Sequence, residues 1–305
     1  MRPLLPCVLL LLALVEVALP QQAKNYQPQP AVLEAKPDED GRKVWFTRYF
    51  RLDSDMVLSP AEMARLSQVA DSTAMVVKSH PLGLFSPPEG QRCQISIYKE
   101  NQDYAAAGGV QGTAGYYFAR RGVVLLQGDY FKEGADRGMP PHYHEDIMAH
   151  EVVHLCMHGV NHKLPQWLVE GIAEYFACAH SGGGRYEFND IDKSLRDHLR
   201  SRLSPNDPGI PLVPVGDLAT LDSHQWMDYV KDLPVNDRYQ AYATALLMAH
   251  YYLNGGAERQ ATVKAALASK ERRAEFPMED PAKIQEALTR YWKAKGLTLE
   301  FAAKK

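Results

Sequence analysis

Two histidines and a glutamate in the stretch IMAHEVVHLC, residues 147–156, have the types and spacing needed to bind and use a metal ion. His150 and His154 are four residues apart, so in a helix both imidazoles project from one face and can share one ion. Glu151 lies directly beside them. In the spacing HExxH the histidines ligate zinc, and the glutamate handles the proton of a zinc-activated water. This stretch therefore predicts a zinc site with an adjacent general base.

A second helix, in LPQWLVEGIAEYFACAH at residues 164–180, is predicted to complete this site. Gly159 is typical of a helix end and Pro165 of a helix start, so the second helix is expected to return beside the first. Glu170 then lies about one turn into it, where its carboxylate is a candidate third ligand that leaves the fourth position to water. Glu174, one turn later, is placed to accept a hydrogen bond from the outer nitrogen of a ligating imidazole.

Gly171 bears on the alternative that Glu170 and Glu174 only form a solvated acidic face. Glycine inside a helix costs about 1 kcal/mol relative to alanine and usually has a reason, such as a close backbone approach. A zinc-bridged pair of helices supplies that reason. The glycine therefore favours the metal site over the solvated face.

The combination of these motifs resembles a known group of enzymes. HEVVH, followed sixteen residues after His154 by the glutamate of WLVEGIAEYF, is similar to the gluzincin metallopeptidases, the clan of thermolysin and the zinc aminopeptidases. It is most similar to a group of bacterial exported proteins, classed mainly as a domain of unknown function, in which WLxEGxAEYF follows HExxH and a later helix begins with tyrosine. YATALLMAHYYL, from Tyr242, resembles that helix, and the similarity covers residues 44–255.

The resemblance implies a role for each matching residue. His150, His154 and Glu170 match the ligands of one Zn²⁺, Glu151 the general base and Glu174 the acid behind the ligands. The chain lacks the G-x-M-E-N signature of the zinc aminopeptidases, so their specificity for free amino termini does not carry over.

The chain also shows no obvious counterpart of the histidine that stabilises the transition state in thermolysin. By position Tyr242 takes that role as a donor to the oxyanion. Tyr239, three residues earlier, is the nearest competitor, and a tyrosine that merely packs in the core is the alternative.

The activity implied is hydrolysis of peptide bonds in a peptide or protein substrate. An extended peptide is expected to align along an exposed strand within residues 115–127, because strand addition positions a backbone without requiring a particular side chain. Two alternatives stay open: a non-catalytic, zinc-stabilised envelope binding module with a closed fourth position, and a zinc amidase that acts on cell-wall material. Glu151 favours an enzyme, because a structural site has no use for a carboxylate in the base position.

The elements that must position these residues are predicted from capping and periodicity. Ser59, Pro60 and Glu62 form a capping box at the start of a helix, and residues 92–99 and 115–127 alternate as strands do. Helices are predicted over residues 145–158, 166–180, 190–203, 238–254, 258–269 and 280–294. The predicted class is α+β and zincin-like, with a mixed sheet and the active-site helix in residues 44–180 and a mainly helical portion in residues 181–305.

The first 20 residues, MRPLLPCVLLLLALVEVALP, are typical of a secretory signal, because the apolar run is too short to span a bilayer comfortably. Removal of the signal and retention as a short anchor both stay open. Residues 21–43 are rich in Gln, Pro and charge, which predicts a disordered tether. The expected location is outside the cytoplasm of a bacterium, periplasmic or secreted, without a stable membrane span once the signal is removed.

Composition narrows the possible partners. The 305 residues are 46% hydrophobic, which is ordinary for a globular protein. Their formal charge of −3 does not favour binding to nucleic acid. Cys93, Cys156 and Cys178 remain after the signal, an odd number that implies no disulfide framework. An antiparallel return of the two site helices would place Cys156 and Cys178 toward opposite ends, so we expect no bond between them.

The remaining histidines near the motif have simpler interpretations. The HYH at residues 142–144 could form a second metal site, but no third ligand lies nearby in the sequence. His158 and His162 are expected to be helix-end cations or solvated residues rather than ligands.

Overall fold

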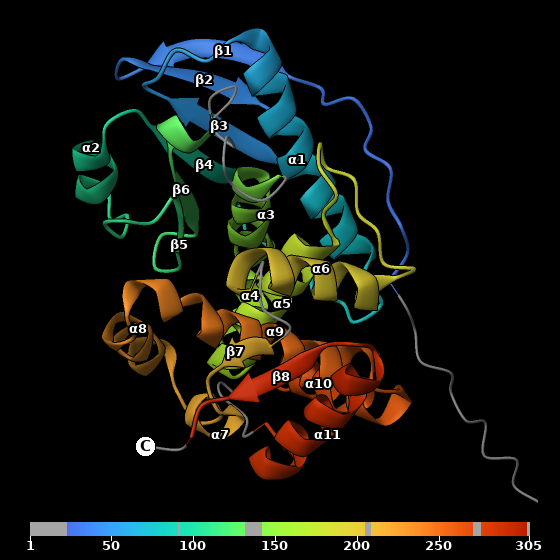
Figure 1. The fold of residues 1–305 in the computed structure, drawn as a ribbon. Coiled ribbons are helices and arrows are strands. Elements are labelled where there is room, and N and C mark those ends of the chain that lie inside the picture. Colours follow the sequence, from blue (N-terminus) through green and yellow to red (C-terminus); the bar gives the residue numbers. More distant parts are fainter. Residues whose placement is uncertain (1–22, 91, 132–141, 205–208, 271–275, 304–305) are drawn as a thin grey trace, which may run out of the picture.

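A six-stranded mixed sheet forms the upper layer of the molecule in Figure 1. The computed structural model describes residues 23–90, 92–131, 142–204, 209–270 and 276–303. The strands are β1 (Glu34–Glu39), β2 (Arg42–Phe46), β3 (Phe50–Ser54), β4 (Cys93–Tyr98), β5 (Gly115–Phe118) and β6 (Val123–Gln127). Their order is β1-β2-β3-β4-β6-β5, with β3–β4 and β4–β6 parallel and the other neighbours antiparallel. β5 therefore lies at one edge of the sheet.

The two faces of the sheet are covered by different helices. Because side chains alternate along a strand, Val124 and Leu126 of β6 face the main core, while Val123 and Leu125 pack with Tyr104 on the other face. Tyr104 belongs to the short helix α2 (Asn101–Ala106). The main-core face is covered by α1 (Pro60–Ser79) and α3 (Tyr143–Cys156), which also contact each other. α3 is thus fixed between α1 and the β5–β6 edge.

The second half of the chain is mainly helical and packs below α3 (Figure 1). α5 (Gln166–Ala179) is central, because it contacts both α3 and α9 (Tyr239–Asn254). The other elements are η1 (Gly128–Phe131), α4 (His158–Asn161), α6 (Ile191–Leu203), β7 (Gly209–Leu212), α7 (Val215–Leu218), α8 (Ser223–Asp232), η2 (Val235–Asp237), α10 (Ala257–Ala268), α11 (Pro281–Ala294) and β8 (Thr298–Phe301). β7 and β8 pair in parallel as a second, two-stranded sheet.

Most predicted elements are confirmed, with ends shifted by one or two residues. The predicted helices correspond to α3 with α4, α5, α6, α9, α10 and α11, and the capping box at Ser59 begins α1. The strands predicted in residues 92–99 and 115–127 are β4 and the hairpin β5–β6. The first site helix ends at Cys156, before Gly159, which lies within α4. A mixed sheet followed by a mainly helical portion agrees with the α+β class; the zincin-like arrangement and the division after residue 180 stay predictions.

The tether predicted over residues 21–43 is wrong for the part that the structure describes. Strand β1 lies within it and pairs with β2, and Tyr26 forms a backbone bridge with Tyr186. β1 is an exposed edge strand held by backbone hydrogen bonds, and an edge tolerates Pro37. Such a strand buries little apolar surface and leaves no periodicity in the sequence. The signal predicted at residues 1–20 lies outside the described residues.

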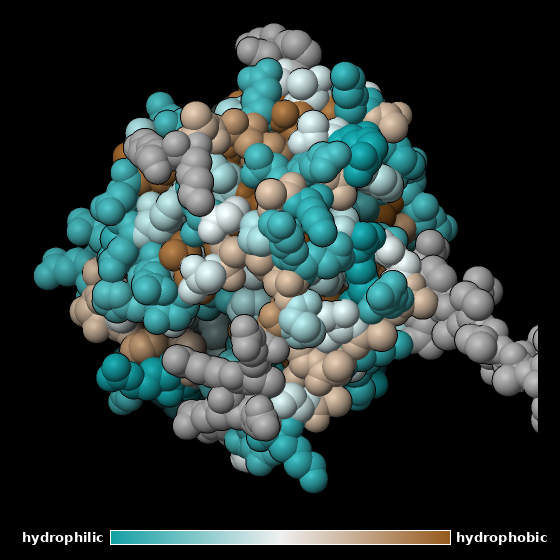
Figure 2. Space-filling view, turned by 90° about the horizontal axis from the view of Figure 1, so that it is seen from below, coloured by the Kyte–Doolittle hydropathy of each residue, from teal (hydrophilic) through white to brown (hydrophobic). Residues whose placement is uncertain are grey.

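The face of the molecule drawn in Figure 2 has no broad apolar patch. Hydrophilic side chains dominate it, and the hydrophobic patches are small. Among the described residues, the large hydrophobic side chains that are exposed are Val32, Val57, Val235 and Tyr291. None of the helices described in the structure is long and apolar enough to cross a membrane.

Candidate metal centre

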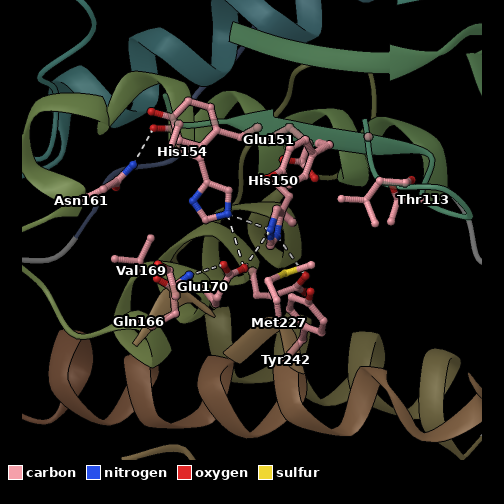
Figure 3. A pocket seen from close by; sticks show the side chains of 18 of the residues that line it. Thr113, His150, Glu151, His154, Asn161, Gln166, Val169, Glu170, Met227 and Tyr242 are labelled. Carbon is pink, nitrogen blue, oxygen red and sulfur yellow. Dashed lines mark hydrogen bonds and ion pairs between the residues drawn. The ribbon is translucent and has the colours of Figure 1, made fainter. Parts of the chain in front are cut away.

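His150 and His154 lie one turn apart on α3 and direct their imidazoles to the same side (Figure 3). Their Nε2 atoms are 3.0 Å apart and their ring centroids 4.7 Å apart. Both residues are buried, with 8% and 6% of their surface exposed. The four-residue spacing has therefore produced the expected pair of converging imidazoles.

α5 brings a carboxylate to these two rings. Glu170 Oε2 lies 3.4 Å from His150 Nε2 and 3.4 Å from His154 Nε2. Pro165 is the N-cap of α5, so Glu170 lies near the start of the helix, on the side that faces α3. Among the described residues, these three form the one group of His, Cys, Asp and Glu whose donor atoms are close enough to hold a metal ion. The structure thus unites the three ligands predicted from the sequence.

Glu174 lies at the other nitrogen of the His150 ring. Its Oε1 is 3.0 Å from His150 Nδ1. Its Oε2 accepts a hydrogen bond of 2.8 Å from the Tyr239 hydroxyl and lies 3.6 Å from His198 Nε2. A carboxylate in this position fixes the orientation and tautomer of a ligating imidazole. The sequence predicted Glu174 but not Tyr239 or His198 as its partners, because they come from α9 and α6 and have no local spacing signal.

The site carries buried negative charge. Burial alone would lower the pKa of His150, but Glu170 and Glu174 raise it well above the ordinary value. Burial would raise the pKa of Glu170, yet the charges of His154 and His150 lower it to about 2. The pKa of Glu174 is also held well below its usual range, because His150 and His198 outweigh burial. Two carboxylates therefore stay ionised inside the protein, and a cation between the histidines would be attracted by both.

Glu151 lies beside the ligands and packs against the sheet edge. A Cβ atom added to Gly115 of β5 would come within 2.9 Å of Glu151 Cγ, so the strand and this side chain are in close contact. Burial raises the pKa of Glu151, an effect that His150 and His154 partly oppose. A raised pKa favours a carboxylate that can both take up and release a proton near neutral pH.

The two tyrosines at the start of α9 have different surroundings. The ring centroid of Tyr242 is 6.2 Å from that of His150, at 68° (Figure 3). Burial raises the pKa of Tyr242, so its hydroxyl is protonated at neutral pH and able to donate a hydrogen bond. Tyr239 is already engaged by Glu174 and by His198, whose Nε2 lies 2.7 Å from its hydroxyl. Tyr242 thus packs against His150 and Trp226 and lines the cavity, whereas the Tyr239 hydroxyl is held by Glu174 and His198.

A cavity of about 1330 Å³ contains the site. One wall is formed by β5 and the loop before it, and another by α8 with the loop that precedes it. Met227 of α8 lines the cavity together with Tyr242 and Glu170 (Figure 3). The cavity is lined by the predicted site residues His150, Glu151, His154, Glu170, Glu174 and Tyr242. The ligands consequently face open space on the side away from α3.

The other histidines do not extend the metal group. His144 is buried against the rings of Tyr130 and Phe131. The part of the chain that the structure describes has no second group of His, Cys, Asp and Glu whose donor atoms could hold a metal ion. His158 begins α4, and its Nδ1 lies 2.5 Å from the Tyr117 hydroxyl. Tyr117 in turn stacks on His154, with ring centroids 5.7 Å apart. His158 thus supports a ligand through Tyr117, a role that the sequence did not predict.

The cysteines are free in the described part of the chain, as expected for Cys156 and Cys178. Cys93, Cys156 and Cys178 are all buried, and burial raises the pKa of each thiol. They are therefore poor nucleophiles and take no part in the site.

Comparison with known proteins adds no family to this description: no family model matches the chain, and no curated protein matches it.

Proposed function

We propose that this protein is an exported zinc metallopeptidase of the gluzincin type. The observation that carries the proposal is the triangle formed by three donor atoms, with sides of 3.0, 3.4 and 3.4 Å. Donors bound to a tetrahedral zinc at about 2.0–2.2 Å are roughly 3.3–3.6 Å apart, close to the sides of this triangle. Two imidazoles and one carboxylate are also a donor set that suits zinc and leaves a fourth position free.

The open side of the triangle supports an enzyme over a zinc-stabilised binding module. A structural zinc is usually bound by four protein ligands, whereas the group here has three and faces a large cavity. Glu151 lies in the wall of the same cavity, next to the ligands. A scaffold would need neither the cavity nor this carboxylate.

The chemistry follows from the positions of the side chains. Zinc, when bound, would polarise a scissile carbonyl and lower the pKa of a water molecule to about 7. Glu151 is the base that accepts the proton and later delivers it to the leaving amine. The Tyr242 hydroxyl donates to the oxyanion that develops in the transition state. Glu174 holds His150 in the orientation needed for ligation.

The peptide backbone is proposed to align along β5. This strand lies at the sheet edge, and its residues Gly115, Tyr116 and Tyr117 line the cavity. A backbone added to an edge strand is positioned by main-chain hydrogen bonds, which suits a range of peptide sequences. The close packing of Gly115 on Glu151 would place that backbone next to the general base.

A peptide library tests the proposed activity directly. Zinc-loaded protein is incubated with a mixed peptide library and, separately, with cell-wall fragments, and new termini are identified by mass spectrometry. We expect cleavage of peptides that stops on chelation and returns with zinc. Cleavage of cell-wall amides alone would indicate the amidase, and tight zinc binding without any cleavage would indicate the binding module.

Removing Glu170 is expected to release the metal. Glu170→Ala takes away one of three protein ligands, and the affinity for zinc should fall by more than the roughly 10–100-fold that loss of an outer partner costs. The measurement is zinc content after dialysis against a weak chelator, with Glu286→Ala on the exposed face of α11 as control. Unchanged zinc retention in Glu170→Ala would remove this residue from the ligand set.

Removing the hydroxyl of Tyr242 is expected to lower turnover without loss of metal. Tyr242→Phe keeps the ring against His150, so kcat should fall by roughly 10²–10³ with little change in KM or melting temperature. The matched variant Tyr239→Phe removes the hydrogen bond to Glu174 and should weaken zinc binding instead. Normal turnover in Tyr242→Phe, with turnover lost in Tyr239→Phe at saturating zinc, would reverse the two assignments.

A further inference from the structure

Glu170 presents its two oxygens to different partners. Oε2 is equidistant from the two imidazole Nε2 atoms, at 3.4 Å from each. Oε1 accepts a hydrogen bond of 2.7 Å from the side-chain amide of Gln166 (Figure 3). Gln166 begins α5, and one helical turn separates it from Glu170. The amide therefore holds the oxygen that does not face the histidines.

This pair differs from an ordinary contact on a helix surface. Pairs of this spacing on exposed helices contribute only about 0.2–0.5 kcal/mol, because water competes for both partners. Here the Glu170 side chain is 12% exposed, and both residues line the cavity. With less water to compete, the amide hydrogen bond restricts the rotation of the carboxylate more strongly.

Gln166 is uncharged, which suits a hydrogen-bond donor beside a metal ligand. A lysine or arginine at this position would place a positive charge next to the metal and compete with it for Glu170. A glutamine donates a hydrogen bond and leaves the negative charge of the carboxylate to the ion. Neutral donors of this kind behind a ligand typically affect metal affinity by 10–100-fold.

The way in which Glu170 binds would set the coordination number of the metal. If Glu170 turned so that both oxygens faced the ion, the second oxygen would take the position that a catalytic zinc keeps open for water or substrate. We propose that Gln166 is a positioning residue that confines Glu170 to coordination through Oε2 alone. This inference rests on the proposed function, because it assumes a metal at His150, His154 and Glu170.

The test removes the side-chain amide of Gln166 and measures the coordination and affinity of the bound metal. Gln166→Met keeps the length of the side chain and removes the donor, and Gln166→Ala is the second variant. Gln240→Met is the matched control, because Gln240 of α9 donates a similar hydrogen bond of 2.9 Å to Asp237 of η2. Each metal-free protein is titrated with cobalt(II), whose visible absorption is strong in four-coordinate and weak in five-coordinate sites, and with zinc in competition with a chelator.

We expect wild type and Gln240→Met to show the strong four-coordinate spectrum. Both Gln166 variants should show the weaker five-coordinate spectrum and bind zinc about 10–100-fold less tightly. A cobalt spectrum and a zinc affinity in Gln166→Met equal to those of the wild type would overturn the role of Gln166 alone. A His154→Ala variant separates this result from failure of the proposed function: if it binds cobalt and zinc as the wild type does, the metal is not at this site and both proposals fall.

Discussion

Glu151→Gln is expected to retain zinc and the fold but to lose at least about 100-fold in kcat, because general-base catalysis contributes roughly 10²–10⁴. Glutamine has the shape of glutamate, so its packing against Gly115 is preserved. It cannot accept the proton of the attacking water. The expected signature is therefore a fall in kcat with unchanged zinc content and melting temperature.

A matched control separates loss of the base from a general effect of losing a carboxylate. Glu286→Gln changes an exposed glutamate on α11, far from the cavity lining, and should leave turnover unchanged. Retention of wild-type kcat in Glu151→Gln would show that another group acts as the base or that the protein is not a hydrolase.

Gly171→Ala is expected to destabilise the packing of α5 on α9. A Cβ atom at residue 171 would lie 2.2 Å from the Ala245 carbonyl oxygen and 2.7 Å from Ala249 Cβ, so α5 and α9 would have to separate. The gain in helix propensity of about 1 kcal/mol is outweighed by an overpacking cost of about 3 kcal/mol, so we expect a net loss of about 2 kcal/mol.

The measurement is the melting temperature, which should fall by roughly 3–4 °C for such a loss in a chain of this size. Because α5 carries Glu170 and α9 carries Tyr242, turnover should fall as well. Gly216→Ala is the matched control, since Gly216 is also helical and its nearest foreign atom, Pro281 Cβ, is 3.9 Å away. Equal stability of Gly171→Ala and the wild type would contradict the close approach of the two helices.

Local sequence signals predicted the elements that carry the site but not all of their partners. The helices α3, α5 and α9 are long runs rich in apolar residues, so their positions followed from the sequence. Gly171 correctly indicated a close backbone approach, but the neighbour is α9 rather than the zinc-bridged α3. α8 was missed although Asp222 and Gln225 form a capping box at its start. β7 and β8 pair across 89 residues of sequence, from Gly209 to Thr298, and left no local pattern.

The candidate ligands could be predicted because two of them are one helical turn apart and the third lies on the next long helix. Of the residues that support them, Glu174 could be predicted because it lies one turn after Glu170, but the others could not, because they come from separate elements. His198 and Tyr239 meet at Glu174 only after α6 and α9 have packed, and Tyr117 reaches His154 from the sheet edge. Gln166 was not predicted either, although it lies four residues before Glu170 on the same helix.

Titration of metal-free protein with zinc, while peptide cleavage is followed, tests directly whether this site is a zinc peptidase centre. We expect no cleavage without metal, a rate that rises in proportion to added zinc, and a plateau at one zinc per chain. His150→Ala should give no such rise at the same zinc concentrations. Cleavage by the metal-free protein, or a zinc dependence unchanged by His150→Ala, would contradict the assignment of this site as a zinc peptidase centre.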